Sequence, residues 1–416
     1  MKKTVTTVVL LFYLGAYGFA QITVEDCYAK ARTNYPLVKQ YGLIEKIKDY
    51  NLSNASKGYL PQISLSAKAV YQSEVTQIPI NLPGIQGLSK DQYGATVEMN
   101  QTIWDGGVIR SKRNAVKTTA EVEKKETDAS LYALNEKINQ LYFSILLLDE
   151  KLNLNCLLQE ELQRHYNQVS VYTQNGIANR TDLNVIKAEQ FKLNQNEAEL
   201  TYTRKAYLEM LSAWLGESLP PDVELQKPDV NQSLTVQIAR PELDLFDAHL
   251  RNLDAKEREI TAGLFPKLGV FVTGGTGRPG LNMLDNDFSL YYVGGVRLTW
   301  NVGNFYTQKN SRGLIAVNKN QIFTQRDVFL LNTTINVTKH THEVEKMKSM
   351  IQYDDEIIRL RNAIKQSAEA KVAGGTFSVT DLMREINAED CAKQDKALHE
   401  TELMMAIYNL KFTTNQ

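Results

Sequence analysis

The spacing of apolar residues along this chain changes from every second residue to every third or fourth residue, and this change occurs twice. In residues 62–71 every second residue is apolar, beginning at Ile63 and ending at Tyr71. The same alternation occurs in residues 95–100, 268–273 and 296–302. A period of two is typical of a strand with one apolar and one polar face. The pattern therefore predicts four strands of about ten residues each.

After each pair of strands the apolar period changes to that of a helix. One run steps by three and four residues in turn, through Leu131, Leu134, Ile138, Leu141, Ile145, Leu148 and Leu152. This spacing forms the a/d seam of a coiled coil. No proline occurs in residues 105–175 or 304–373, which predicts two helices of about 70 residues, each about 105 Å long. The second seam is less regular and passes through Val344, Met347, Ile351 and Ile358.

Shorter helices are expected on either side of these elements. Residues 36–57 and 241–261 precede the strands, and residues 182–215 and 381–412 follow the long helices. Each shorter helix is about half as long as a long helix. One shorter helix is therefore expected to pack along each half of a long helix. The fold class is thus α+β, with a long antiparallel α-helical coiled coil and four strands.

The two halves of the chain repeat one another. The stretch NGIANRTDL begins at Asn175 and GGTFSVTDL begins at Gly374, and their Gly, Thr, Asp and Leu residues are separated by 199 positions. The element order is the same in both halves. We therefore interpret the chain as a tandem duplication, with repeats at 24–216 and 240–414 and a proline-bearing linker at 217–239.

The N-terminus indicates export. Residues 1–20 combine Lys2 and Lys3, a short apolar run and a small-residue exit at Ala20, which is typical of a signal peptide. A transmembrane helix is the alternative, but the apolar run is short for one, and no later run reaches the 18 or more apolar residues that a span needs. The formal charge of −1 disfavours a nucleic-acid partner. Cys27, Cys156 and Cys391 lack metal-like spacing and are expected to be buried or half-buried thiols.

Several stretches imitate catalytic or metal sites. TGGTGRPG (273–280) lacks the Gly-Lys-Ser/Thr ending of a phosphate loop, so a strand running into a loop is expected. His340 and His342 are two apart and point away from each other on a helix, so solvated histidines are expected. Asp354, Asp355 and Glu356 are expected to form a solvated helix face. We therefore expect no catalytic residue, no metal site and no cofactor, and the protein is not expected to be an enzyme.

Ten alternating residues in an exported protein also match the length of a strand that crosses the outer membrane. A soluble sheet remains the alternative, because sequence alone does not say which face is wet. If the strands cross a membrane, four cannot close a barrel and open edges in hydrocarbon are costly. Eight strands from a dimer leave an interior filled by side chains, whereas twelve from a trimer leave room for water. A polar inner face favours the trimer.

The chain resembles the TolC family of outer-membrane efflux proteins over its whole mature length. The resemblance is carried by YPLVK and RPEL at the start of each half, GYLP and GLFP before the first strands, WDGG after the second strand and the two Gly-x-x-x-x-Thr-Asp-Leu turns. It implies a homotrimer with a twelve-stranded barrel in outer-membrane lipid and a helical tunnel through the periplasm. It also implies a periplasmic adaptor and an inner-membrane transporter as partners. The sequence departs from the family pattern at WNVGNFY, which leaves the second strand-to-helix junction in doubt.

Two groups of candidate site residues follow. The turns between long and short helices are expected to form the periplasmic tip that docks on the adaptor, with Asn179 and Ser378 as helix caps three residues before an aspartate: Gly176, Asn179, Arg180, Thr181, Asp182, Gly375, Ser378, Thr380 and Asp381. Arg180, Asp182 and Asp381 are the charged candidates for gating. The strand-to-helix junctions are expected at Pro61, Asp105, Gly106, Gly107, Pro266, Gly303 and Asn304, with Asp105 and Asn304 as caps.

The function expected is the exit duct of a tripartite efflux or type I secretion system, acting as a passive conduit. The alternative is an exported structural coiled-coil protein with no role in transport.

Overall fold

The computed structural model describes residues 21–76, 88–176, 178–230 and 237–415. The expected signal peptide, residues 1–20, lies outside the described residues. The chain divides into two compact units. We call Lys39–Ala129 together with Pro241–Leu331 the strand unit, and Met1–Val38, Ser130–Arg240 and Asn332–Gln416 the helical unit.

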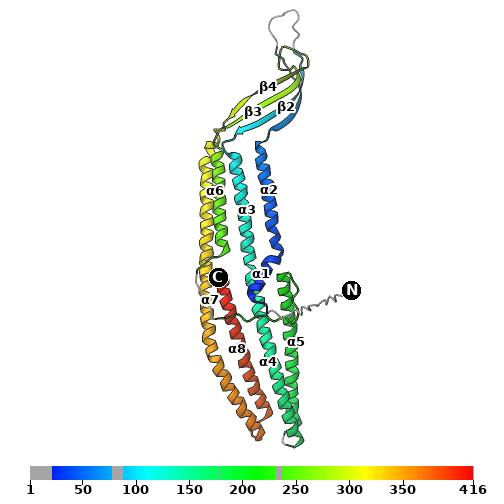
Figure 1. Ribbon diagram of the computed structural model, residues 1–416, viewed down its shortest axis with the longest axis vertical. Coiled ribbons are helices and arrows are strands. Elements are labelled where there is room, and N and C mark those ends of the chain that lie inside the picture. The colour runs from blue at the N-terminus through cyan, green and yellow to red at the C-terminus, as the bar shows by residue number, and fades with distance from the viewer. Residues whose placement is uncertain (1–20, 77–87, 177, 231–236, 416) are drawn as a thin grey trace, which may run out of the picture. The chain divides into compact units, whose positions relative to one another are not determined.

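The strand unit carries one antiparallel sheet in the order β1-β2-β3-β4. Its strands are β1 (Gln62–Tyr71), β2 (Asp91–Trp104), β3 (Lys267–Arg278) and β4 (Ser289–Thr299). Helices α2 (Lys39–Ser56) and α6 (Pro241–Ala262) lead into β1 and β3 (Figure 1). Helix α3 (Val108–Tyr132) follows β2, and α7 (Asn304–Ala373) follows β4. The four predicted strands and the helices around them are confirmed.

Two strand boundaries differ from the prediction. Strand β2 begins before the alternating core of residues 95–100. Strand β4 ends at Thr299, so the expectation that Trp300 and Val302 belong to it is wrong. The Trp300 indole donates instead to the carbonyl of Leu264 at 3.0 Å, which fixes the ring beside the end of α6. The glycine-rich TGGTG segment is strand, as expected.

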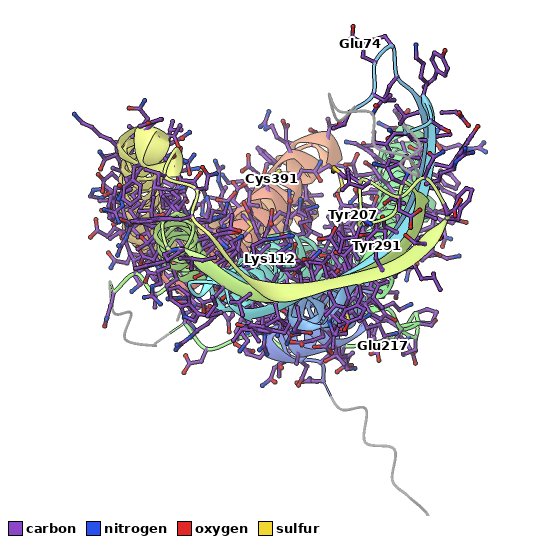
Figure 2. All side chains as sticks on the ribbon, turned by 90° about the horizontal axis from the view of Figure 1, so that it is seen from above. Glu74, Lys112, Tyr207, Glu217, Tyr291 and Cys391 are labelled. Carbon is purple, nitrogen blue, oxygen red and sulfur yellow. The ribbon has the colours of Figure 1, made fainter. Side chains whose placement is uncertain are left out.

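The register of the sheet separates an apolar face from a polar one. Leu65 pairs with Val97, Val97 with Gly274, and Gly274 with Tyr292, so these residues share one face. The remaining large apolar members of that face are Ile63, Tyr71, Tyr93, Met99, Leu268, Val270, Val272, Leu290, Val296 and Leu298. On the other face Ser66 and Thr96 hydroxyls lie 2.7 Å apart, and Arg297 lies 3.4 Å from Glu98. Figure 2, in which Tyr291 marks β4, shows the sheet bent into an arc.

The glycines of β3 make room for an aromatic ring on the polar face. Gly275 is opposite Tyr291 in the register. A Cβ at Gly275 would lie 2.9 Å from Tyr291 Cζ and 2.8 Å from the Ala95 carbonyl. The ring therefore lies against the β3 backbone, which requires a residue without a side chain.

The helical unit is built from two hairpins and an N-terminal helix (Figure 1). The first hairpin joins α4 (Leu134–Gln174) to α5 (Arg180–Leu215), and the second joins the later part of α7 to α8 (Val379–Thr414). The predicted 70-residue second helix is confirmed. The first long helix is interrupted at Ala133, so the expectation of an unbroken helix is wrong at that residue, although Ala133 keeps right-handed helical angles.

The predicted seam of the first long helix forms the core of this unit. Leu131, Leu134, Ile138, Leu141 and Ile145 are buried, and Leu148 and Leu152 are half-buried. The first linker residues pack on this core. Ile22 forms a parallel bridge with Leu225, and the Tyr142 hydroxyl lies 2.7 Å from the carbonyls of both Ile22 and Gln226.

Helix α1 (Val24–Asn34) was not predicted as a separate helix. The Asp26 N–H donates to Thr23 Oγ1 at 3.0 Å, and the Thr23 N–H donates to Asp26 Oδ2 at 3.2 Å. This reciprocal pair is a capping box. The Thr-x-x-Asp spacing in the sequence was the signal that could have located it.

Burial of several polar residues differs from the prediction. Asp354 is buried against His399, with Nδ1 and Oδ2 2.8 Å apart, so it is not part of a solvated face. His340 is largely buried beside Glu343, whereas His342 is exposed as expected. Cys27 is buried, but Cys156 and Cys391 are exposed, so their expected burial is wrong.

Within the described residues, no helix combines the length and apolar character needed to cross a membrane.

Candidate functional site

Both hairpins of the helical unit turn at a glycine with left-handed backbone angles. Gly176 has φ +77° and Gly375 has φ +74°. At the second turn the Gly375 N–H donates to the Val372 carbonyl at 3.0 Å, and the Thr376 N–H donates to the Lys371 carbonyl at 2.9 Å. These bonds form a Schellman motif. At the first turn the Gly176 N–H donates to the Thr173 carbonyl at 3.2 Å, which is the corresponding bond.

The helix after each turn has the predicted aspartate as its third residue. At the first turn the Asn179 N–H donates to Asp182 Oδ2 at 2.9 Å. At the second turn the Asp381 N–H donates to Ser378 Oγ at 3.1 Å, and the Ser378 hydroxyl donates to Asp381 Oδ2 at 2.7 Å. Both aspartates also place negative charge at a helix N-terminus, which is favourable.

A shared apolar core lies behind the two turns. Its buried members come from all four hairpin helices: Leu158, Leu162, Val169, Ile186, Leu193, Ala368, Val379, Leu382, Met383 and Ile386. Ile186 of α5 and Ile386 of α8 are almost fully buried in it. The two tips therefore lie at the same end of the helical unit (Figure 1). The predicted tip residues themselves remain on the surface, where Gly176, Asn179, Arg180, Thr181, Gly375, Ser378 and Thr380 are exposed and Asp182 and Asp381 half-exposed.

Charged side chains are buried beside this core, and the sequence analysis missed them. Lys365 of α7 is 8% exposed and lies 2.6 Å from both Glu161 of α4 and Glu389 of α8. Glu389 also accepts from Lys393 at 2.9 Å and from the Asn362 amide at 3.0 Å. The lysine thus joins the first hairpin to the second. We call Glu161, Lys365 and Glu389 the ionic bridge.

The ionic bridge keeps its carboxylates charged. Burial acts to raise the pKa of Glu389, but hydrogen bonds from Lys365, Asn362 and Lys393 lower that pKa overall. The His165 imidazole and the Lys365 ammonium lower the pKa of Glu161 to about 2, against the opposing effect of burial. Buried charges of this kind are stable only while every partner is present.

In the strand unit, the junction between β2 and α3 has the predicted geometry. The buried Asp105 carboxylate accepts from the Gly107 N–H at 2.9 Å and from the Ile109 N–H at 2.6 Å. These bonds cap α3. Gly106 has φ +68°, and a Cβ there would lie 2.5 Å from Phe265 Cβ. Only glycine fits this close approach.

The junction between β4 and α7 is built differently. Asn304 is the first residue of α7, and its side-chain amide donates to the Gly263 carbonyl at 2.7 Å. Its expected role as a helix cap is therefore wrong. Unlike Gly106, Gly303 does not have left-handed backbone angles. Pro61 and Pro266 directly precede β1 and β3, where a residue without an N–H ends the preceding helical turn.

Comparison with known proteins agrees with this architecture. Residues 28–217 match the family described as outer membrane efflux protein. No curated protein matches the chain by sequence. Among solved structures, the outer membrane protein VceC from Vibrio cholerae is similar at 11% identity and a TM-score of 0.67, over 94% of this chain and 95% of that one.

Two further channels show the same fold. The Campylobacter jejuni outer membrane channel CmeC matches at 14% identity and a TM-score of 0.64, over 94% of this chain and 85% of its own. The open state of the Neisseria gonorrhoeae outer membrane channel MtrE matches at 14% identity and a TM-score of 0.66, over 94% and 88%. The family match covers residues 28–217, and the fold of these outer membrane channels extends over 94% of the chain. Together they indicate a protein of the outer membrane that extends into the periplasm.

Proposed function

We propose that three copies of this chain form the exit duct of a tripartite efflux or secretion system. The duct would be a twelve-stranded barrel in the outer membrane, continued by a helical tunnel through the periplasm. It would act as a passive conduit, because the candidate site residues are capping and turn-forming groups and the inner-membrane partner would supply the energy.

The observation that carries this proposal is the apolar face of the sheet. Leu65 is 77% exposed and Leu290 is 88% exposed, and their face is predominantly apolar on all four strands, with Asp91, Thr276 and Arg278 toward one end and Gln101 toward the other. Continuous exposed apolar surface is costly in water and natural in lipid. Aromatic residues lie toward both ends of the strands, with Tyr71 and Tyr93 at one end and Trp104 and Trp300 at the other. Such belts are typical of membrane interfaces.

The edges of the sheet support assembly of several copies. Among the described strands, β1 pairs only with β2, and β4 pairs only with β3. An open edge in hydrocarbon leaves backbone groups unpaired, at a cost of several kcal/mol each. Pairing of β1 of one copy with β4 of the next removes both edges. Twelve strands leave a water-filled interior for the polar face of Ser66, Thr96 and Arg297.

Helix α7 supports the same conclusion independently. Along its later part, apolar residues at steps of three and four are exposed: Met350, Tyr353, Ile357, Leu360 and Ile364. This is an a/d seam that the described residues of the chain cover only in part. A helix from a neighbouring copy would complete the coiled coil.

We further propose that the two turns of each chain form the entrance of the duct and its contact with a periplasmic adaptor. A trimer would present six turns in one ring, with two related surfaces per chain, consistent with a tandem duplication. Asp381 and Arg384, 3.2 Å apart, are candidates for the charged contacts that change on opening, together with Arg180 and Asp182.

Fractionation and conductance test the duct. The purified mature protein should come from the outer membrane as a heat-modifiable trimer and should form water-filled pores in a planar bilayer. Release of a monomer by osmotic shock would contradict the proposal and favour the exported structural coiled coil.

The turns are tested separately. Gly176→Val and Gly375→Val should abolish export while the trimer still assembles, because each forces a β-branched residue into left-handed angles. Gly313→Val is the matched control, since Gly313 lies within α7 and a Cβ there has open space. Normal export by both turn variants would count against the docking role.

A further inference from the structure

A mixed nitrogen and oxygen donor set lies beside the ionic bridge. Glu161 and His165 are four residues apart on α4 and therefore share one face of the helix. Glu369 of α7 faces them, with its Oε1 3.4 Å from His165 Nε2. Glu161 Oε1 lies 3.9 Å from the same nitrogen, and the three ligand atoms all lie within 4.8 Å of one another.

These separations suit a small divalent cation. Zinc binds imidazole nitrogen and carboxylate oxygen at about 2.0–2.2 Å, so ligand atoms around a tetrahedral ion are about 3.4 Å apart. The pair formed by His165 and Glu369 already has this spacing. An approach of about 0.5 Å would bring Glu161 Oε1, now 3.9 Å from His165 Nε2, to the same spacing. One imidazole with two carboxylates suits zinc, cobalt(II) or copper(II) better than magnesium or calcium, which prefer all-oxygen sites.

The surroundings hold the donors and leave a way in. His165 is 8% exposed and the Glu161 side chain is 16% exposed, so both are held by packing. The Glu369 side chain is 36% exposed, which gives a cation access from solvent and leaves room for a water as the fourth ligand. Glu161 is also fixed from outside the donor set, since its Oε1 accepts from Lys365 at 2.6 Å. Such outer contacts are typical supports of metal ligands.

The local charge admits a cation. Glu161, Glu369 and Glu389 contribute three negative charges, against the two positive charges of Lys365 and Lys393. Lys365 lies between Glu161 and Glu389, so its charge is shared with a carboxylate outside the donor set. Because an imidazole that binds a metal does so in its neutral form, the group offers a cation one excess negative charge.

We propose that Glu161, His165 and Glu369 form a binding site for a divalent transition metal of the zinc class. The ion would join α4 of the first hairpin to α7 of the second, next to the apolar core behind the turns. Filling the site would therefore oppose separation of the two hairpins. The site does not depend on the proposed duct function, because it rests on contacts within one chain.

Metal titration of the purified, tag-free mature protein in detergent tests the site. Calorimetry with Zn²⁺ should show one saturable site per chain. Co²⁺ should give the absorption spectrum of a tetrahedral complex containing a nitrogen ligand. His165→Gln and Glu369→Gln should each weaken binding by at least about tenfold, the loss seen even when outer contacts of a metal site are removed.

His342→Gln is the matched control, because His342 also faces a glutamate on α7 but is exposed. It should bind Zn²⁺ like the parent protein. Circular dichroism and the trimer band verify that each variant is folded. Two separate ligand variants keep the test decisive if one of them fails to fold. Absence of saturable Zn²⁺ binding by the parent, or unchanged binding in the folded ligand variants, would overturn the proposal.

Discussion

The two compact units of the chain treat their apolar residues in opposite ways. In the helical unit Leu162, Ile186 and Leu211 are almost fully buried, and the heptad seam of α4 packs against neighbouring helices of the same chain. In the strand unit every residue of β1 is exposed, and the large apolar residues of β4 are among the most exposed in the molecule. Apart from the exposed seam of α7, the helical unit therefore holds its own core, whereas in the proposed duct the sheet would depend on lipid and on further copies. Substitutions that act on one unit or the other test this contrast.

The largest effect is expected on the apolar face of the sheet. Leu65→Arg should prevent assembly in the outer membrane, because an arginine on the lipid face costs about 2–4 kcal/mol per chain near the midplane. Ser66→Arg, one residue away on the polar face, is the control and should assemble. The heat-modifiable trimer in outer-membrane fractions is the measurement. Equal assembly of both variants would remove the distinction between the two faces.

A smaller effect is expected at the ionic bridge of the helical unit. Lys365→Met leaves Glu389, which is 2% exposed, without its main counter-charge. Removal of one partner of a buried ion pair costs about 3–5 kcal/mol. Arg359→Met breaks an exposed pair with Glu356, and exposed pairs contribute little to stability because water and salt screen them. Denaturant unfolding followed by circular dichroism compares them, and equal stabilities would mean that the bridge is not buried in the assembled protein.

The two strand-to-helix junctions provide the third comparison. Gly106→Ala should destabilise the trimer by about 2 kcal/mol, since left-handed angles alone cost about 1–2 kcal/mol in a residue with a Cβ and that Cβ would overlap Phe265. Gly303→Ala lacks the left-handed angles and should be nearly neutral. The temperature at which the trimer dissociates in detergent measures both. A larger loss at Gly303 would show that the second junction carries the strain.

The smallest expected effect is a dependence on pH. The folded protein lowers the pKa of Glu161 from its ordinary value of 4.5 to about 2. A lowered carboxyl pKa stabilises the folded state above the unfolded value, and this contribution is lost as the pH falls from about 4.5 toward 2. Between pH 5 and pH 3 the parent should lose on the order of 1 kcal/mol more stability than Glu161→Gln. Parallel stability curves would contradict this assignment.

The range of the contacts along the chain explains which features could be predicted from the sequence. The strands, the long helices and the turns were predictable because alternation, heptad spacing and glycine placement are local patterns. Asp105 was identified as a cap because its partners follow within four residues. Asn304 has a similar position, yet its amide contacts Gly263, which is 41 residues away. A contact of that kind depends on how α6 ends, and no local pattern encodes it.

The buried charged residues were the main feature that could not be predicted from the sequence. Asp354 lies in a polar run, but its carboxylate meets His399 of α8. His165 and Glu161 have helical spacing, but Glu369 reaches them from the other hairpin. Packing between the two hairpins decides which helix covers a given heptad position. The periodicity within one helix therefore does not reveal which residues are covered.

The three cysteines offer a practical consequence of the helical unit. Burial raises the pKa of the Cys27 thiol to about 12, so it stays protonated and unreactive toward labels. Cys156 on α4 and Cys391 on α8, the latter marked in Figure 2, are exposed. The unmodified protein therefore accepts a pair of spin or fluorescent probes, one per hairpin, and the spacing between them can be followed spectroscopically as zinc is added.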